Sequence, residues 1–191
     1  MRAFISLNPD YDTKKKISEI QLNVKEKVFE INKDFFNSIK WEPEDKFHMT
    51  LFFIGEIDEA NINKVRFKLT EMENELENHE MIFSAIGINA FPKLKIPRVI
   101  IIELENKDKN VFVLSERINS KLKEMNIHSD KKFYPHVTIG RVKKDRKINL
   151  TGIKGKIISE LEFGVKNFFL MKSELKSSGS EFSVLKEYNV K

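Results

Sequence analysis

The sequence predicts an α+β fold in which two pseudo-symmetric lobes of antiparallel sheet, with flanking helices, surround a central cleft. Apolar residues recur at helical spacing in three segments, and seven other segments have the composition of β-strands. Several strand segments are joined by links too short for a crossover helix, which permits antiparallel neighbours and argues against a doubly wound parallel sheet. A strand–helix–strand order occurs twice along the chain, which predicts the two similar lobes.

The three helical segments each carry an apolar stripe whose members recur every three or four residues. Each stripe is expected to face a hydrophobic core. Asp58 stands where it would cap the second of these helices. The stripes consist of Ile17, Ile20, Val24, Val28, Ile31 and Phe35, of Ile62, Val65, Leu69, Met72 and Leu76, and of Val111, Leu114, Ile118, Leu122 and Met125.

Segments typical of β-strands lie between these helices. Residues 92–97 form a short, turn-rich link, so the two strands that they join are expected to be antiparallel neighbours. The expected strands are residues 2–7, 48–54, 81–91, 98–105, 136–142, 160–171 and 182–190.

The strand–helix–strand order repeats in architecture rather than in residue identity. The first half ends with strand 48–54 and the second half ends with strand 136–142, and both of these strands open with His-x-Thr. Two such halves related by a pseudo-twofold axis would bring the two strands together and line one cleft from both sides. We interpret residues 1–191 as a single domain of two interleaved lobes, each with one motif.

The composition is that of a globular chain with a heavily charged surface. Charged residues make up 33% of the chain and the formal net charge is +5. This charge fits a polyanionic partner, and it fits equally well a lysine-rich surface that serves solubility. Because there is no cysteine, disulfides, thiolate metal sites and a cysteine nucleophile are excluded. No segment resembles a signal peptide or a membrane span, so we expect a cytoplasmic protein without a membrane partner, and we take it to be a monomer.

The two motifs are His48-Met49-Thr50-Leu51 and His136-Val137-Thr138-Ile139. On a strand, residues i and i+2 project to the same face, so each His shares a face with its Thr while the hydrophobic neighbours pack on the other side. The four His and five Thr residues of the chain would give about 0.1 His-x-Thr sequences by chance, and two are present. A single histidine on a strand is more often structural, but two in matched positions favour a functional pair.

Two histidines on opposite sides of a phosphate can supply both proton transfers that open a cyclic phosphodiester with water. One imidazole takes a proton from the water and the other gives a proton to the leaving oxygen, and histidine can do either near neutral pH. In-line displacement requires the two rings to flank the phosphorus, which suits one histidine from each half. The hydroxyls of Thr50 and Thr138 can donate to the non-bridging oxygens of the phosphate.

Arg141 is the candidate cation for the charge that builds on those oxygens in the transition state. It lies five residues after His136, and strict alternation along a strand would place it on the opposite face. A bend or bulge near Gly140 is therefore required to bring Arg141 to the face of the motif. The alternative for Arg141 is an ion pair at the surface.

The motifs and their surroundings resemble the 2H phosphoesterases, specifically the bacterial and archaeal RNA 2′,3′-cyclic phosphodiesterases, also called 2′-5′ RNA ligases. The two His motifs at this separation are the specific part of the resemblance, whereas the flanking pieces are individually weak. The resemblance runs nearly end to end, through residues 1–5, Trp41, residues 48–56, Phe91, Pro92, and residues 97–99, 134–141, 173–175 and 179.

The resemblance implies two similar lobes with a cleft between antiparallel sheets, and it assigns a role to each motif residue. His136 would be the general base that activates water, and His48 the general acid that protonates the leaving O3′, which leaves a 2′-phosphate. Thr50, Thr138 and Arg141 would bind the phosphate. We expect no metal and no organic cofactor, because neither motif contributes a second His or an adjacent carboxylate at ligand spacing.

Two positions depart from the family pattern, and two histidines lie outside the motifs. Ile101 stands where an aromatic residue is usual, and Phe182 stands in place of a late Tyr. We expect neither of them to touch the chemistry, although either could alter contacts with a nucleoside or RNA. His79 and His128 lie in polar stretches between elements and are best explained as solvated loop histidines.

Basic and aromatic residues on both sides of the second motif suggest a track for single-stranded RNA that bears a 2′,3′-cyclic phosphate end. The aromatic pair fits a place in the core equally well. No glycine-rich phosphate loop is present. Two alternatives to hydrolysis stay open: formation of a 2′-5′ linkage by the reverse reaction, and a non-catalytic RNA-binding module. The flanking residues are Lys131, Lys132, Phe133 and Tyr134 before the motif and Lys143, Lys144, Arg146 and Lys147 after it.

Overall fold

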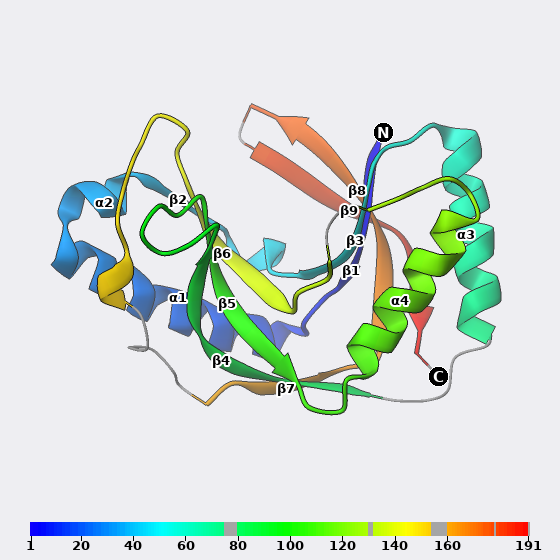
Figure 1. Cartoon of the computed structure of the whole chain (residues 1–191), viewed down its shortest axis with the longest axis horizontal. Helices are drawn as coiled ribbons and strands as arrows, with labels where there is room; N and C mark the ends of the chain where they lie inside the picture. The colour runs from blue at the N-terminus through cyan, green and yellow to red at the C-terminus, as the bar shows by residue number, and fades with distance from the viewer. Residues whose placement is uncertain (75–79, 130–131, 154–159, 178, 191) are drawn as a thin grey trace.

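Two antiparallel sheets with helices on their outer sides make up the computed structural model, which describes residues 1–74, 80–129, 132–153, 160–177 and 179–190 (Figure 1). The strands are β1 (Arg2–Leu7), β2 (Ile39–Trp41), β3 (Met49–Glu56), β4 (Met81–Phe91), β5 (Val99–Asn106), β6 (His136–Val142), β7 (Glu162–Val165), β8 (Asn167–Lys176) and β9 (Gly179–Asn189). The helices are α1 (Tyr11–Ile31), α2 (Lys33–Asn37), α3 (Glu59–Asn74) and α4 (Asn110–Lys123), with short 3-10 turns at Glu44–Lys46 and Thr151–Ile153.

Each motif strand pairs with the first strand of its own half, but β3 is an edge strand whereas β6 lies between β2 and β5. The first sheet has the order β3-β1-β8-β9, and the second has the order β2-β6-β5-β4-β7. In both halves the strand after the helix returns antiparallel to the strand before it, so that β3 pairs with β1 and β6 pairs with β5. The α+β class with antiparallel sheets is confirmed, as is the antiparallel pairing of β4 with β5 across the short link.

α1 and α4 each cross from the sheet of the preceding strand to the other sheet. α1 follows β1 of the first sheet but packs on the second, where the side-chain amide of Gln21 donates to the carbonyl oxygen of Ile139 in β6 at 2.7 Å. α4 follows β5 of the second sheet but lies with α3 beside the first, where it contacts β3 (Figure 1). Each half therefore supplies the helix that covers the other half's motif strand.

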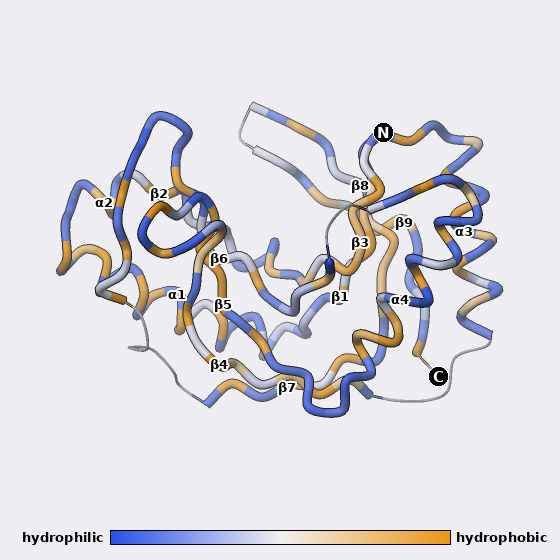
Figure 2. Tube along the Cα trace, viewed as in Figure 1, coloured by the Kyte–Doolittle hydropathy of each residue, from blue (hydrophilic) through white to orange (hydrophobic). Residues whose placement is uncertain are grey.

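The predicted apolar stripes form the core between the helices and the sheets, except that Ile31 is 42% exposed at the end of α1. Ile17 and Val24 of α1, Val65 and Leu69 of α3 and Ile118 of α4 are fully buried. Figure 2 shows hydrophobic residues along β1, β3, β5 and β6, and alternating hydrophobic and hydrophilic residues along α3 and α4. Burial of one face of each helix, rather than helix propensity, therefore holds the helices in place.

Local capping explains where two helices begin. Asp58 accepts a hydrogen bond of 2.7 Å from the backbone N–H of Asn61, so it caps α3 as predicted. Asn32 interrupts the first stripe, because its side chain accepts the N–H of Asp34 at 2.7 Å and starts α2 as a separate helix. Phe35 therefore belongs to α2. Leu76, the last member of the second stripe, lies outside the described residues.

One expected strand was wrong, and one short strand was not anticipated. The segment 160–171 is not a single strand: β7 pairs with β4 in the second sheet and β8 pairs with β1 in the first. The alternation of buried residues changes phase at Lys166 and Asn167, where two residues in succession are not buried, and this is the point where the chain changes sheets. β2, with three residues, is too short to give a periodic signal.

No helix in the described ranges has both the length and the apolar character needed to cross a membrane.

Candidate active site

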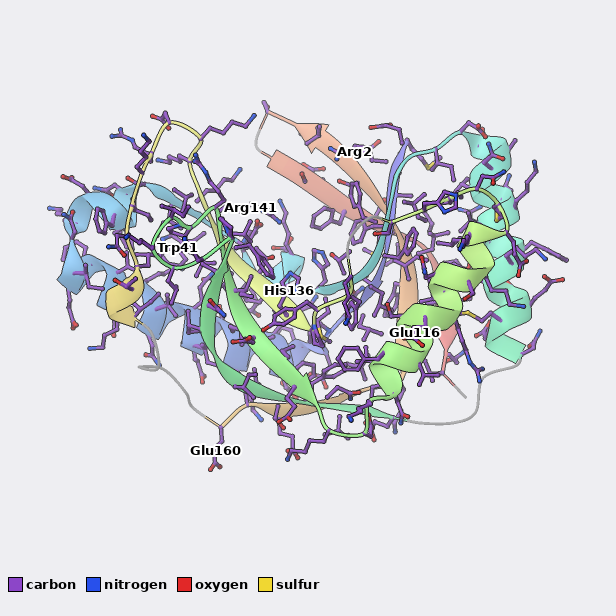
Figure 3. The ribbon with its side chains drawn as sticks, in the orientation of Figure 1. Arg2, Trp41, Glu116, His136, Arg141 and Glu160 are labelled. Carbon is purple, nitrogen blue, oxygen red and sulfur yellow. The ribbon has the colours of Figure 1, made fainter. Side chains whose placement is uncertain are left out.

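Both His-x-Thr motifs line one cleft between the two sheets. The cleft has a volume of about 920 Å³, and β3 and β6 supply opposite parts of its wall. Figure 3 shows His136 and Arg141 on the β6 side of the space between the sheets, and Arg2 on the β1 side. The five predicted site residues that line the cleft are His48, Thr50, His136, Thr138 and Arg141.

A bulge in β6 brings Arg141 to the same face as the motif. Ile100 pairs with Gly140 but Ile101 pairs with Thr138, so Ile139 is an extra residue on this strand. Ile139 and Gly140 are both buried, which reverses the alternation, and Arg141 then points with Thr138 into the cleft. The bend or bulge near Gly140 that was needed to place Arg141 on the face of the motif is present.

The same irregularity occurs in β3. Ile5 pairs with Phe52 and Ser6 pairs with Thr50, so Leu51 is the extra residue there. The residue five positions after His48 is thereby turned into the cleft, and this residue is Phe53. The guanidinium carbon of Arg2 lies 5.4 Å from the centre of the Phe53 ring. The first strand thus presents an aromatic ring with a cation stacked on it where the second strand presents Arg141.

Backbone carbonyls orient both imidazoles in the same way. Nδ1 of His48 lies 2.7 Å from the carbonyl oxygen of Lys46, and Nδ1 of His136 lies 2.7 Å from that of Tyr134. A carbonyl can only accept, so Nδ1 carries the hydrogen in both rings and Nε2 is the nitrogen left to exchange a proton. Nε2 of His48 lies 3.2 Å from Oγ1 of Thr50.

The pKa values of both histidines are lowered, but the charges around the two rings differ. The pKa of His136 falls to about 4, first because the ring is desolvated and then because Arg141 is close. Burial also lowers the pKa of His48, while its hydrogen bond to Lys46 and the carboxylate of Glu42 act in the opposite direction. Both rings are therefore neutral in the empty cleft at neutral pH.

Glu42 is a partner of the cleft residue Arg141 that the sequence did not reveal. Its Oε1 accepts a hydrogen bond of 2.8 Å from Nε of Arg141. The buried side chain of Gln21 donates to the backbone carbonyls of Glu42 and Ile139, at 2.7 Å each. One amide thus ties the bulge residue of β6 to the residue that pairs with Arg141. A surface ion pair was the alternative interpretation of Arg141. Arg141 forms such a pair with Glu42, and it also lines the cleft.

Sequence comparisons place this chain among known proteins. The model of a family described as LigT like Phosphoesterase matches residues 14–101. A protein of Aquifex aeolicus is 32% identical over 98% of this chain and 96% of its own length, and one of Thermotoga maritima is 30% identical over 98% and 94%. Both carry the name RNA 2′,3′-cyclic phosphodiesterase. The chain belongs to the LigT-like phosphoesterase family.

Solved structures agree with this family assignment at the level of the fold. A Thermus thermophilus protein superimposes with a TM-score of 0.81 at 24% identity, over 100% of this chain and 98% of its own. Escherichia coli LigT complexed with 3′-AMP gives a TM-score of 0.72 at 16% identity, over 99% of this chain and 97% of its own. A phosphoesterase function follows from the family, and its particular reaction is taken up below.

The structure corrects one expectation about the departures of this phosphoesterase from its family. Phe182 contacts the site, because its ring lies 5.2 Å from the ring of His48 in an edge-on arrangement and 5.2 Å from the ring of Phe4, which itself lies 5.1 Å from His48. Ile101 is fully buried in β5 and lies away from the cleft lining. The residue at position 182 therefore positions the first histidine, which strand alternation alone did not show.

The remaining residues near the second motif divide between core and cleft. Phe133 is partly buried against the core and also lines the cleft, and Tyr134 is 39% exposed and lines the cleft. Phe91 packs edge-on against His136 at 5.1 Å. His128 is exposed and is not part of the cleft lining, and His79 and Lys131 lie outside the described residues. Within the described part of the chain no group of three or more His, Asp and Glu side chains is placed to hold a metal ion, and independence from metals stays a prediction.

Proposed function

We propose that this phosphoesterase is a single domain of two interleaved lobes that hydrolyses the 2′,3′-cyclic phosphate end of RNA to a 2′-phosphate. The observation that carries the proposal is the pair of matched imidazoles. Each has its Nδ1 fixed by a carbonyl two residues before it, and both line one cleft with Thr50, Thr138 and Arg141. The relatives named RNA 2′,3′-cyclic phosphodiesterase match almost the whole chain, which supports this substrate.

In the proposed reaction, water attacks the phosphorus from the side of His136. Nε2 of His136 takes a proton from the water as the new P–O bond forms, and the bond from phosphorus to O3′ breaks. Nε2–H of His48 gives its proton to O3′, so the products are a 3′-hydroxyl and a 2′-phosphate. Arg141 and the two Thr hydroxyls stabilise the charge on the non-bridging oxygens.

The electrostatics of the cleft support this division of roles. Arg141 and desolvation disfavour a proton on His136, which suits a base that must start neutral. Desolvation is the largest influence on His48 as well and lowers its pKa, while the hydrogen bond to Lys46 and the carboxylate of Glu42 act in the opposite direction, as suits the acid. A bound phosphodiester anion raises the pKa of both rings from their values in the empty cleft.

A non-catalytic binding module would not need this arrangement. Binding alone requires cations and hydrogen-bond donors, whereas two imidazoles with matched Nδ1 partners, in a cleft that both rings line, supply an acid and a base through their Nε2 atoms. Joining, in which a 5′-hydroxyl takes the place of the attacking water and a 2′-5′ linkage forms as the bond to O3′ breaks, uses the same groups.

The test is incubation with a short RNA that bears a 2′,3′-cyclic phosphate, with and without a chelator. We expect a 2′-phosphate product, and we expect the rate to be unchanged by exhaustive chelation. His48→Ala and His136→Ala variants serve as inactive controls. A 3′-phosphate product, or an unchanged substrate in the presence of folded wild-type protein, would contradict the proposal.

A further inference from the structure

A second pocket adjoins the catalytic cleft at the Arg141 end of β6. It has a volume of about 500 Å³ and shares Pro92 and Arg98 with the cleft, so the two spaces adjoin at these residues. It lies between the loop 92–98 and the segment 143–149, which run side by side beyond the ends of β5 and β6 (Figure 1). A chain that leaves the catalytic centre past Arg141 therefore enters this pocket directly.

The two segments that form the pocket concentrate the positive charge of the protein. Residues 92–98 contain three basic side chains and no acidic one, and residues 143–149 contain four basic side chains and one acidic. These 14 residues carry a formal charge of +6, against +5 for the whole chain, so the remainder of the protein is close to neutral. The excess positive charge is thus confined to one place, which a surface adapted only for solubility does not require.

Few carboxylates compete for these cations. Asp145 lies 3.4 Å from Nε of Arg146. Among the residues that the structure describes, no other carboxylate lies within 4.0 Å of a basic side chain of the two segments. Lys95, Lys144 and Lys147 are exposed, so they are available to an anionic ligand.

Backbone hydrogen bonds hold the two segments in register. Leu150 N–H donates to the carbonyl of Leu94 at 2.8 Å, and Val142 N–H donates to that of Arg98 at 3.0 Å. The guanidinium of Arg98 donates to the carbonyl of Lys144 at 3.2 Å. The pocket is therefore built before any ligand arrives, and its shape does not depend on the exposed lysine side chains.

The lining combines cations with apolar surface. Phe35, Ile96 and Pro97 contribute the apolar part, and the side chain of Ile96 is 57% exposed. Spaced cations beside apolar surface match a single-stranded nucleic acid, whose phosphates alternate with bases that expose flat faces. A single small anion would use only one or two of these cations.

We infer that this pocket, which we call the strand subsite (Lys95, Ile96, Arg98, Arg146 and Lys147), binds the RNA nucleotides 5′ to the cyclic phosphate end. The inference rests on the proposed function, because it requires RNA in the catalytic cleft. It specifies in addition that substrates with several nucleotides gain affinity here, whereas a mononucleotide does not reach the subsite.

The test compares a nucleoside 2′,3′-cyclic phosphate with a six-nucleotide RNA bearing the same end, each measured as kcat/KM over a range of salt. In the Lys95→Ala/Arg146→Ala/Lys147→Ala variant, kcat/KM for the oligonucleotide should fall about tenfold at low salt, and the slope of log kcat/KM against log salt should become less negative by roughly 2. The mononucleotide should be hydrolysed as by the wild type. Lys14→Ala/Lys15→Ala/Lys16→Ala is the matched control, since it removes the same charge from α1, outside both linings.

The outcomes separate the inference from the proposed function. Two results would overturn the strand subsite and leave the hydrolytic function standing. In the first, the subsite variant and the control variant lose the same kcat/KM on the oligonucleotide. In the second, the subsite variant loses the same kcat/KM on both substrates. Wild-type protein that hydrolyses neither substrate would overturn the proposed function itself. If the triple variant does not fold, the single variants Lys95→Ala and Lys147→Ala provide the test. Each must have a lower kcat/KM for the oligonucleotide and an unchanged kcat/KM for the mononucleotide.

Discussion

The two motif strands have the same backbone and different side chains at one matched position. In β3 and in β6 an extra residue follows the Thr of the motif, at Leu51 and at Ile139, and turns the fifth residue after the His into the cleft. That residue is Phe53 in one strand and Arg141 in the other. A cation reaches the cleft in both cases, directly from Arg141 or through Arg2, which stacks on Phe53. Both halves thus use a bulge in the motif strand, whereas the positive charge comes from β6 in one half and from β1 in the other.

The largest effect is expected from the histidines, where the two strands should be equivalent. His48→Ala and His136→Ala should each lower kcat by about 10²–10⁴-fold, because each removes a positioned acid or base. The double variant should cost far less than the product of the two losses.

A substrate with an activated aryl leaving group sharpens this comparison. Such a leaving group needs no protonation, so the loss caused by His48→Ala should shrink while that caused by His136→Ala persists. His128→Ala is the control and should retain the wild-type kcat, because His128 is exposed outside the cleft lining. A loss at His128 as large as that at His48 would mean that the catalytic pair is misassigned.

Replacement of the fifth residue should separate the two strands. Arg141→Ala should lower kcat by about 10²-fold, because it removes a donor that stabilises transition-state charge. Phe53→Ala should cost less than about tenfold, since Arg2 loses its stacking partner but keeps its charge. Steady-state kinetics with the cyclic phosphate substrate measures both, and equal losses would show that Arg2 and Arg141 serve the phosphate alike.

The bulge of β6 can be tested through Gly140. A Cβ at this position would lie 3.0 Å from Cγ2 of Ile39 and 3.1 Å from Cε3 of Trp41. Gly140→Ala should therefore lower the free energy of unfolding by about 1–3 kcal/mol, as overpacking does. It should also lower kcat, because the shift moves Arg141.

Gly87→Ala is the matched control for this experiment. Gly87 also follows a register shift in a central strand, and a Cβ there would meet nothing within 4 Å. Denaturant unfolding and kcat together give the result: if Gly140→Ala were as harmless as Gly87→Ala, close packing by Trp41 would not be what holds the bulge.

The smallest effect is expected in the dependence of stability on pH. Because the pKa values of His48 and His136 are lower in the folded protein than in the unfolded chain, protonation favours the unfolded state. The free energy of unfolding should be unaffected by these groups above about pH 6.5, the ordinary value for histidine. It should fall as the pH drops from there toward about 4, the pKa of His136 in the fold. The fall in Tm between pH 7 and pH 5 should be smaller in His136→Ala than in wild type, and unchanged in His128→Ala.

The sequence alone identified those site residues whose pattern lies within one short segment of the chain. The alternation of His48-Met49-Thr50-Leu51 and of its counterpart predicts which side chains share a face, and Arg141 could be included only by requiring a bulge. The same five-residue spacing applied to His48 would have indicated Phe53. Glu42 and Arg2 could not be found in this way, because the pairing of β2 with β6 brings Glu42 to Arg141 and the pairing of β1 with β3 brings Arg2 to the cleft. Such pairings depend on distant parts of the chain, and a single sequence does not display them.

The crossing of the helices has a consequence for any attempt to divide the molecule. A fragment that ends within the link 92–97 contains β3 and α1, but the strand β6 on which α1 packs and the helix α4 that covers β3 are both in the other fragment. Each piece alone would leave an apolar helix face in water, whereas the two mixed together can bury both faces. We therefore expect the halves to behave as complementary fragments that regain the fold only in each other's presence.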